Sequence, residues 1–470
     1  MFDLLRYKDR TAVITDRGEQ LTYRELAAAT NSFAAAITKK GLLFCLCENL
    51  LGSLVGYVAC MEHHIPVVLL DGGKDFALLK ALIDIYQPEY VWADTAKIEN
   101  TKGAAIHRYA SFSLQKMLYE ADDVVKPEIN PELALCLTTS GSTGSPKFVR
   151  LSEKNVLANA ESIAEYLGIN EAERPATTLP SYYSYGVSVI NSHLIKGATI
   201  LLTDGTIAQR EFWNFIKENK ATSIAGVPYT YEMLKRLRFF RMDLPSLRTM
   251  TQAGGKLNKE IAKEYIEFAQ SNGKRFFVMY GQTEATARMS YLPLEYALDK
   301  YSSIGIAIPH GKFSLMDENG NTIDNPDVDG ELVYEGPNVC LGYAECRADL
   351  AKGDENHGVL HTGDVARRDA DGYYYITGRM KRFVKVWGNR CNLDAIEQLV
   401  KGITTNCACV GVDDKITVFV TEPCFEETII KLLAEKTGFN NRAFAVKVID
   451  SIPVKSSGKT DYPALQQKLN

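Results

Sequence analysis

The sequence lacks the cysteine and histidine patterns that mark metal and redox sites. Its ten cysteines include two C-x-C pairs but no C-x-x-C spacing, so neither a zinc site nor a dithiol redox motif is indicated. Free cysteines are usually buried, and we expect reduced thiols in the core. His63 and His64 are adjacent and would point apart on a helix or strand, which makes them a poor pair of ligands.

An excess of positive charge and long apolar runs are also missing. The chain has 53 Lys and Arg against 58 Asp and Glu, a formal net charge of -5, so nucleic acid is not an expected partner. The most apolar stretch, Gly41–Met61, is interrupted by Glu48 and Asn49 and is too broken to span a membrane. The opening MFDLLRYKDR places charges where a secretory signal needs its apolar segment. We therefore expect a cytoplasmic protein without a membrane span.

The 470 residues contain no low-complexity tract and no repeat with a period of 20 to 50 residues, which excludes solenoids. From about Leu133 to Tyr280, short apolar runs alternate with amphipathic segments, a pattern that predicts an α/β fold with a mainly parallel sheet covered on both faces. Ligands are then expected past the carboxyl ends of the strands. The predicted strands are 133–139, 198–203, 222–225, 247–251 and 276–280, and the predicted helices are 155–166, 209–217, 259–270 and one from Tyr229.

The pattern changes twice toward the end of the chain. Between residues 303 and 375 turn-rich text separates short strands, which predicts a β subdomain over about 303–378. After Gly378 helices and strands alternate again, with helices expected over 394–400 and 426–435 and strands near 407–412, 416–421 and 444–449. We therefore predict an N-terminal domain of residues 1–378 with parallel-rich sheets, and a small α+β C-terminal domain of residues 379–470.

The segment TTSGSTGSPK, residues 138–147, follows a predicted strand and precedes a predicted helix. Small residues let backbone N–H groups approach an anion, and the hydroxyls and Lys147 add donors and a positive charge. Its spacing does not match a Walker A loop. The context favours a phosphate-binding loop over a flexible linker.

A second candidate for a phosphate-binding loop, PVKSSGKTDY at 453–462, also fails the Walker A spacing. Lys459 taken alone is typical of a solvated tail.

Six segments, taken in order, resemble the ANL superfamily of adenylate-forming enzymes, which includes acyl-CoA synthetases, adenylation domains of peptide synthetases and luciferases. They are TSGSTGSPK (139–147), YGQTE (280–284), GELVYEGPNVCLGY (330–343), HTGD (361–364), GYYYITGRMKRFVK (372–385) and SSGK (456–459). The resemblance covers nearly the whole chain. It implies that ATP and a carboxylic acid form an acyl-AMP with loss of pyrophosphate, after which the acyl group passes to a thiol of CoA or of carrier-protein phosphopantetheine.

The resemblance also implies roles for individual residues in binding ATP and Mg²⁺. Tyr280 and Gly281 would lie at the adenine, Thr283 would bond the α-phosphate, and Glu284 would bind the metal, a hard cation that prefers carboxylate oxygen. Asp364 and Arg379 would reach the ribose. The β- and γ-phosphates would be held by Thr139, Ser140, Gly141, Ser142, Thr143, Gly144 and Lys147.

The same resemblance gives a role to the C-terminal domain. Lys459 would stabilise the charge that builds up when the acid attacks the α-phosphorus. Lys381 would be the hinge about which the domain rotates, and Gly388 would border the tunnel for the thiol arm. A plain turn glycine is the alternative interpretation of Gly388.

The chain departs from the family pattern at Phe148, where glycine is usual, and at Tyr183, where many acyl-CoA synthetases have a histidine. Relatives that activate amino acids carry an Asp in the segment 179–194, which here contains no acidic residue. An ammonium group would stay unpaired there, so an acid without an amino group is favoured. Family positions predict an acyl pocket lined by Tyr182, Tyr183, Gly226, Val227, Pro228, Ala253, Gly254 and Gly255.

Three alternatives to an acid–thiol ligase stay open at this point. A D-alanine–carrier-protein type of ligase is disfavoured by the missing Asp, and a non-catalytic nucleotide-binding relative is disfavoured by the presence of Lys459, Glu284 and Asp364. A luciferase-like oxygenase has no distinguishing motif in the sequence. The identity of the acid, the choice between CoA and an acyl carrier protein, and the oligomeric state are not determined by sequence.

Overall fold

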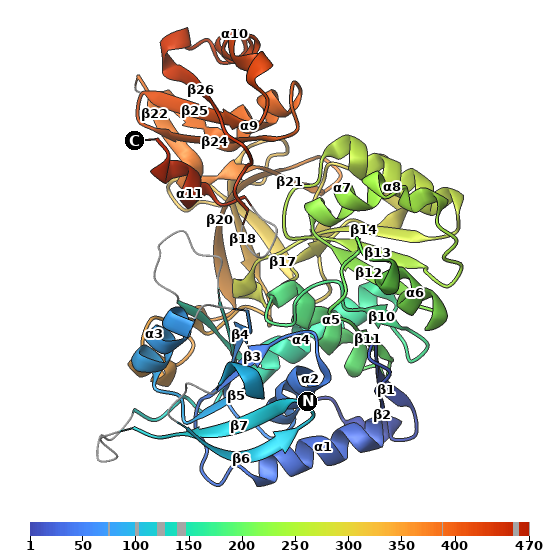
Figure 1. Cartoon of the computed structure of the whole chain (residues 1–470). Helices are drawn as coiled ribbons and strands as arrows, with labels where there is room; N and C mark the ends of the chain where they lie inside the picture. Colours follow the sequence, from blue (N-terminus) through green and yellow to red (C-terminus); the bar gives the residue numbers. More distant parts are fainter. Residues whose placement is uncertain are drawn as a thin grey trace. The chain divides into compact units, whose positions relative to one another are not determined.

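A computed structural model describes residues 1–73, 76–98, 103–119, 127–138, 147–387, 389–454 and 460–469, without the side chains of residues 381, 383, 389, 390 and 424. The chain divides into two compact units (Figure 1). The first contains residues 1–301, 307–312 and 335–360, and the second contains residues 302–306, 313–334 and 361–470.

Two large sheets organise the first unit. One has the strand order β16 (Ile306–Ala307), β15 (Ser290–Tyr291), β14 (Arg275–Tyr280), β13 (Thr249–Gln252), β12 (Ser223–Gly226), β10 (Pro175–Ala176), β11 (Ile200–Leu202), β1 (Thr11–Thr15), β2 (Gln20–Thr22). The other has the order β19 (Gly342–Ala344), β9 (Phe148–Ser152), β8 (Leu133–Thr138), β4 (Val67–Asp71), β3 (Leu43–Cys47), β5 (Tyr90–Asp94), β7 (Phe112–Met117), β6 (Gly103–Tyr109). In both sheets the central pairs are parallel.

Helices cover these sheets and share a core with them. They are α1 (Tyr23–Ala35), α2 (Leu51–Glu62), α3 (Phe76–Tyr86), α4 (Glu153–Leu167), α5 (Ser184–Leu194), α6 (Arg210–Glu218), α7 (Pro228–Arg236) and α8 (Lys259–Ser271). Helix α4 contacts β8 and β9, α5 contacts β11, and the two helices pack together, so they lie between the sheets. Figure 1 shows α7 and α8 along the other side of β12–β14. One apolar cluster joins Leu69 of the eight-stranded sheet, Val187 of α5 and Ile200 of the nine-stranded sheet.

In its described residues, the second unit contains three smaller sheets and three α-helices. A four-stranded sheet has the order β17 (Lys312–Met316), β18 (Gly330–Glu335), β20 (Val359–Arg368), β21 (Tyr374–Arg379). It is followed by the pair β22 (Phe383–Val386) and β23 (Asn389–Asn392), and by the sheet β24 (Cys407–Val412), β25 (Lys415–Val420), β26 (Phe444–Val448). The helices are α9 (Leu393–Lys401), α10 (Glu426–Thr437) and α11 (Tyr462–Gln467). A separate apolar core formed from residues 384–446 holds this last part together.

The predicted α/β fold class is confirmed, and most predicted elements lie within a few residues of their positions. Helix α4 ends as expected at Gly168, whose φ of 65° is the left-handed conformation that glycine adopts without strain. The apolar stretch Gly41–Met61 forms β3 and the buried helix α2 of the core. None of the described helices combines the length and apolar character that a bilayer crossing requires.

One prediction about the glycine-rich segment is wrong. We expected this segment to connect a strand directly to a helix, but β9 intervenes and pairs antiparallel with β8. Phe148, the residue that departs from the family pattern, begins this strand. It is fully buried, and its ring stacks on Tyr86 with centroids 4.3 Å apart. Strand β9 therefore lies between the glycine-rich segment and α4, which begins at its Ser152 cap.

Candidate nucleotide and acyl site

Three neighbouring parallel strands end at one edge of the nine-stranded sheet. Gly226 of β12 is in register with Gln252 of β13, and Gln252 is in register with Val278 of β14. The segments that follow, 227–228, 253–255 and 281–285, therefore start side by side. Because parallel strands direct their carboxyl ends to the same edge, this is where a ligand is expected in such a sheet.

Glu284, Tyr343 and Lys147 form a polar group beside this edge. The Tyr343 hydroxyl donates to Glu284 Oε1 over 2.8 Å, and Lys147 Nζ lies 3.8 Å from the centre of the Tyr343 ring. Burial and the Glu284 carboxylate raise the pKa of Tyr343 well above its usual range, so its hydroxyl stays protonated as a donor. Tyr343 thus contacts both the cation at the end of the glycine-rich segment and the carboxylate of the YGQTE segment.

Thr283 and its neighbours lie in a short 3-10 turn, Thr283–Ala285, directly after β14. Thr283 Oγ1 is 3.1 Å from Ser184 Oγ at the start of α5. The Glu284 carbonyl accepts a hydrogen bond from the Cys340 N–H over 2.8 Å. The turn is therefore attached both to α5 and to the segment 336–343, and it carries one hydroxyl, of Thr283, and one carboxylate, of Glu284.

Gly281 has a packing reason beside its predicted role. A Cβ at this position would lie 1.8 Å from the Ala287 carbonyl oxygen, so only glycine fits. Thr286 and Ala287 continue the turn with φ values of 57° and 105°, which are rare for residues other than glycine. Tyr280, at the end of β14, accepts a hydrogen bond from Gln282 over 3.3 Å. The YGQTE segment is thus a tightly folded turn after a central strand.

Most of the predicted acyl-pocket residues lie together. A Cβ built on Gly254 would meet the Tyr183 hydroxyl at 2.6 Å and Val227 Cγ1 at 3.1 Å. Ala253 belongs to the same apolar cluster as Val227. Burial raises the pKa of Tyr183 to about 12, with Arg288 opposing the shift, so the Tyr183 hydroxyl is neutral where family members carry an imidazole.

The other predicted pocket residues have different surroundings. Gly255 approaches Pro228, since a Cβ there would lie 3.2 Å from Pro228 Cγ. Gly226 faces Tyr231 of α7, which would be 2.8 Å from a Cβ. Tyr182 packs against the core cluster between the two sheets instead of the cluster that contains Tyr183. The place of Tyr182 in the acyl pocket therefore stays a prediction.

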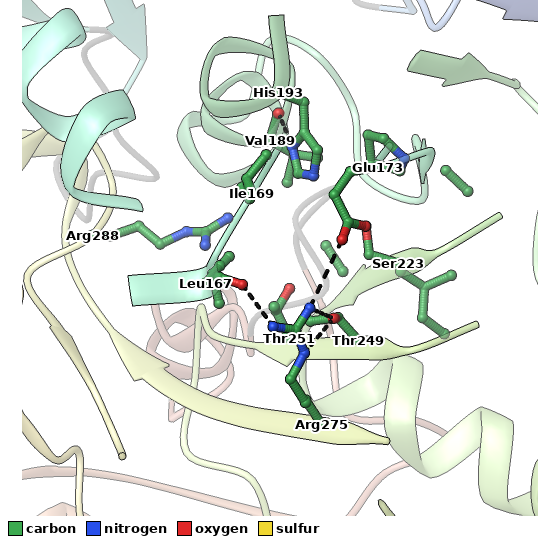
Figure 2. A pocket seen from close by; sticks show the side chains of 14 residues that line it. Leu167, Ile169, Glu173, Val189, His193, Ser223, Thr249, Thr251, Arg275 and Arg288 are labelled. Atoms are coloured by element: carbon green, nitrogen blue, oxygen red, sulfur yellow. Dashed lines mark hydrogen bonds and ion pairs between the residues drawn. The ribbon is translucent and has the colours of Figure 1, made fainter. Parts of the chain in front are cut away.

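A small cavity lies between α5 and the strands β10, β12, β13 and β14. Figure 2 shows His193, Glu173, Arg275 and Arg288 around it. Glu173 is buried and satisfied, since it pairs with Arg248 over 2.9 Å and accepts a hydrogen bond from the Thr222 hydroxyl. Arg275 donates to the Thr249 hydroxyl and to the Leu167 carbonyl. None of these cavity residues was predicted from the sequence.

His193 is a neutral acceptor in this cavity. Its Nδ1 lies 2.8 Å from the Val189 carbonyl, which can only accept, so Nδ1 carries the proton and Nε2 carries the lone pair. Burial, together with a smaller contribution from the neighbouring Arg288 cation, lowers the pKa of His193 to about 4.

In the second unit, Asp364 and Arg379 face each other across β20 and β21. Arg379 Nε donates to Asp364 Oδ1 over 3.0 Å, and Asp364 is only 3% exposed. The predicted ribose-binding pair is thus brought together, with Arg379 on the exposed side. Their approach to the YGQTE segment stays a prediction, because these residues belong to the other compact unit.

Lys381 lies in the short turn Met380–Arg382, which follows β21. The next residue, Arg382, is fixed to the C-terminal core: it pairs with Asp394 and Glu397, and its guanidinium lies 3.6 Å from the Tyr462 ring centre. Of the other predicted residues, Gly388, Lys459 and the loop residues Thr139, Ser140, Gly141, Ser142, Thr143 and Gly144 lie outside the described residues.

Sequence reasoning missed Tyr343, Ser184 and Asn338, although each lies inside a segment that had been singled out. Asn338 is 1% exposed, and its Nδ2 donates to the Ala285 and Arg288 carbonyls over 2.7 and 3.1 Å. Its own carbonyl accepts from the Thr286 hydroxyl. These hydrogen bonds of Asn338 could have been suspected from the sequence, because a polar residue stands there among apolar neighbours.

Among the described side chains, eight cysteines are buried thiols, as expected, and Cys346 is exposed. No group of three or more His, Cys, Asp or Glu residues in the described ranges could hold a metal ion.

The fold and this edge of the sheet place the protein among the enzymes that bind a nucleotide beside parallel strands. A family described as AMP-binding enzyme matches residues 3–344, and this chain belongs to that family. The resemblance to adenylate-forming enzymes is thereby confirmed.

Individual relatives are more distant. The chain is 28% identical over 290 residues to a feruloyl-CoA synthase of an Amycolatopsis species, covering 60% of this chain and 57% of that one. The matched part thus spans less than two thirds of that relative. A 2-succinylbenzoate–CoA ligase of Bacillus licheniformis is 26% identical over 471 residues and covers 96% of this chain and 95% of its own. The o-succinylbenzoate CoA synthetase of Bacillus subtilis, solved with an acyl-adenylate, shares the fold at a TM-score of 0.78 and 20% identity, covering 99% of this chain and 97% of that one.

Proposed function

We propose that this protein uses ATP to activate a carboxylic acid as an acyl-AMP, releases pyrophosphate, and then transfers the acyl group to a thiol. The observation that carries the proposal is the group formed by Lys147, Tyr343 and Glu284 at the carboxyl edge of the parallel strands. It combines a cation from a glycine-rich segment with a carboxylate, as a site for a nucleotide phosphate chain and its metal requires. The membership in the AMP-binding family supports the same chemistry.

The donor set fits a bound Mg²⁺. This ion is usually held by one or two carboxylates together with phosphate oxygens. Glu284 uses Oε1 to accept from Tyr343, and within the described residues its Oε2 has no partner. When bound, the metal would neutralise charge on the phosphates that leave. Glu284 would hold it, Tyr343 would orient the carboxylate, and Thr283 would donate to the α-phosphate.

We assign charge stabilisation during adenylation to Lys459, the lysine of the SSGK segment. The attacking carboxylate and the α-phosphate are both anionic, so a cation that contacts both lowers the barrier. Lys381 would be the hinge, since Arg382 directly after it is anchored to the C-terminal core by Asp394 and Glu397. A rotation about this point needs only a few backbone torsions.

The acceptor is a thiol of CoA or of carrier-protein phosphopantetheine. Relatives named as CoA ligases favour CoA. The alternative of a D-alanine–carrier-protein type of ligase is disfavoured by the buried cation Arg288 near the predicted acyl pocket, because it would repel a substrate ammonium.

The test is acid-dependent exchange of pyrophosphate into ATP, measured for the wild type, Lys459→Ala and the control Lys455→Ala from the same tail. Loss of a charge stabiliser of this kind costs about a hundred- to thousandfold in rate. We expect that loss for Lys459→Ala alone, with thiol transfer from preformed acyl-AMP largely retained. Exchange by the wild type that no acid stimulates would contradict the proposed function. Equal loss of both half-reactions in Lys459→Ala would contradict the role of this lysine.

A further inference from the structure

The unexplained feature of the first unit is Arg288, eight residues after Tyr280. Its side chain is only 2% exposed, and it lines the cavity beneath α5. Figure 2 shows its guanidinium pointing toward the cavity from the side of the view opposite Glu173. A charged group at this depth has lost its water, so its environment has to replace that solvation.

The protein supplies only weak partners to this guanidinium. Nη1 lies 3.2 Å from the Tyr166 hydroxyl and 3.3 Å from Met279 Sδ, and the guanidinium carbon lies 4.6 Å from the centre of the Tyr185 ring. Its Nε is buried without a hydrogen-bond partner. No carboxylate in the described part of the chain pairs with Arg288, although a guanidinium cannot be deprotonated in proteins.

The other arginines near this cavity lie close to a carboxylate. Arg248 pairs with the buried Glu173, and Arg275 lies 3.9 Å from the same carboxylate and donates to Thr249. The sheet therefore provides a carboxylate where an arginine is structural. Arg288 has a donor left over and no anion, which is the arrangement expected when a ligand brings the anion.

The cavity adjoins the predicted acyl pocket. Arg288 faces the Tyr185 ring, whose centre is 6.4 Å from that of Tyr183, and the Tyr183 hydroxyl lies next to Gly254. Arg288 is also close enough to Tyr183 to act on its pKa. Tyr183 and Tyr185, whose rings are neighbours, thus lie between the predicted acyl pocket and Arg288.

We propose that Arg288 binds a second anionic group on the acid substrate, so that the substrate class is a short dicarboxylic acid. One carboxylate would be activated at the strand edge, and the other would pair with Arg288 in the cavity. This inference rests on the proposed function and makes it more specific. A small cavity with a charged end suits the end of a short diacid better than a long fatty chain.

The experiment compares acids that differ only in the second carboxylate: glutarate with pentanoate, and adipate with hexanoate. For each pair the ratio of kcat/KM in pyrophosphate exchange is measured, and this ratio does not depend on the fraction of active enzyme. A site built for a polar group discriminates strongly against the analogue that lacks it. We expect the wild type to prefer the diacid, and Arg288→Met to lower the ratio about a hundredfold. Arg288→Lys should retain part of the preference, because it keeps the charge.

The matched control is Arg17→Met, which removes an exposed arginine paired with Asp204 and should leave the ratio unchanged. A wild-type preference for the monoacids, or a ratio that Arg288→Met does not alter, overturns the inference while exchange with any acid still supports the proposed function. If no acid stimulates exchange, the proposed function fails instead. In that case thermal unfolding with glutarate alone tests the proposed anion site at Arg288. If glutarate stabilises the wild type and not Arg288→Met, the site is supported. If glutarate does not stabilise the wild type, the site is overturned.

Discussion

Among the described arginines of the first unit, Arg150 and Arg288 are the most deeply buried, at 0% and 2% exposed, but their surroundings differ. Arg150 in β9 makes five hydrogen bonds. Their acceptors are the carbonyls of Leu341, Tyr343, Lys352 and Gly353 and the carboxylate of Glu355. The Arg288 guanidinium contacts the Tyr166 hydroxyl, the Met279 sulfur and the face of the Tyr185 ring. A buried charge with all its donors used holds a fold together, whereas one with a donor left over is available to a ligand.

The difference between Arg150 and Arg288 should be largest in the stability of the unliganded protein, where substitution of Arg150 has the larger expected effect. Arg150→Met removes the group that ties β9 to the segment 341–355, and it leaves several buried carbonyls without a donor. Leaving a buried acceptor unsatisfied costs about 1–3 kcal/mol, and several carbonyls are affected here, whereas the Glu355 side chain is 47% exposed and remains hydrated. We expect a loss of this size in the free energy of unfolding in urea.

The control for Arg150→Met is Arg17→Met, whose ion pair with Asp204 is exposed and is worth at most about 1 kcal/mol. Equal losses in the two variants would mean that the carbonyls around Arg150 recover their hydrogen bonds from water. The proposed contrast between the two buried arginines would then disappear.

The pH dependence of stability tests how well the cavity around Arg288 excludes water, because His193 lines the same cavity. Burial lowers the pKa of His193 to about 4 from its usual 6.5, and the charged groups that line the same cavity are Arg288, Arg275 and Glu173. The unfolded chain therefore takes up the proton first as the pH falls, so stability present above pH 6.5 is lost on the way to pH 4. The loss reaches about 3 kcal/mol.

We expect the unfolding free energy of His193→Gln to fall less between pH 6.5 and pH 4 than that of the wild type, by up to about 3 kcal/mol. His64→Gln is the control, because His64 is exposed beside Glu153. If both variants kept the wild-type pH profile, His193 would be free to accept a proton. The cavity around Arg288 would then be wetter than its burial implies.

The sequence was sufficient where the signal is local. The end of α4 at Gly168 and the alternation of strands and helices follow from backbone preference and periodicity. Strand β9 was missed because it pairs with β19 and packs through Phe148 on Tyr86, and both of these partners are distant in the sequence. The Arg150–Glu355 pair and the Lys147–Tyr343 contact also join distant segments, which no local pattern reports.

Arg288 illustrates the same limit for the site. Its position shortly after the YGQTE segment is visible in the sequence, but what distinguishes it from Arg275 is the absence of a carboxylate partner among the described residues. That property depends on which side chains the fold brings around it, and the sequence order does not contain it. The motifs therefore predicted the edge of the sheet that holds the site, and the structure was needed to find the unpaired cation.

Asn338 tests how firmly the turn that carries Arg288 is held. Asn338→Ala removes the donor to the Ala285 carbonyl and one of two donors to the Arg288 carbonyl, the other being Asn159. Leaving a buried acceptor unsatisfied costs about 1–3 kcal/mol, and we expect that loss in urea unfolding. Asn272→Ala, an exposed residue after α8 with a bond to the Phe268 carbonyl, should cost less. A smaller loss in Asn338→Ala than in this control would show that the turn is held by other contacts.

The smallest effect on unliganded stability is expected for Arg288→Met. This variant tests directly whether Arg288, unlike Arg150, is dispensable for the fold. The Tyr166 hydroxyl also lies 3.0 Å from Met279 Sδ, so the substitution leaves no buried carboxylate and no unpaired hydroxyl behind. Replacing a poorly paired buried charge with an apolar side chain of similar volume is often neutral or stabilising. We expect the free energy of unfolding in urea to stay within about 1 kcal/mol of the wild type or to rise. A loss as large as that of Arg150→Met would show that Arg288 is a structural residue, and its unpaired donor would no longer be a reason to expect an anionic ligand.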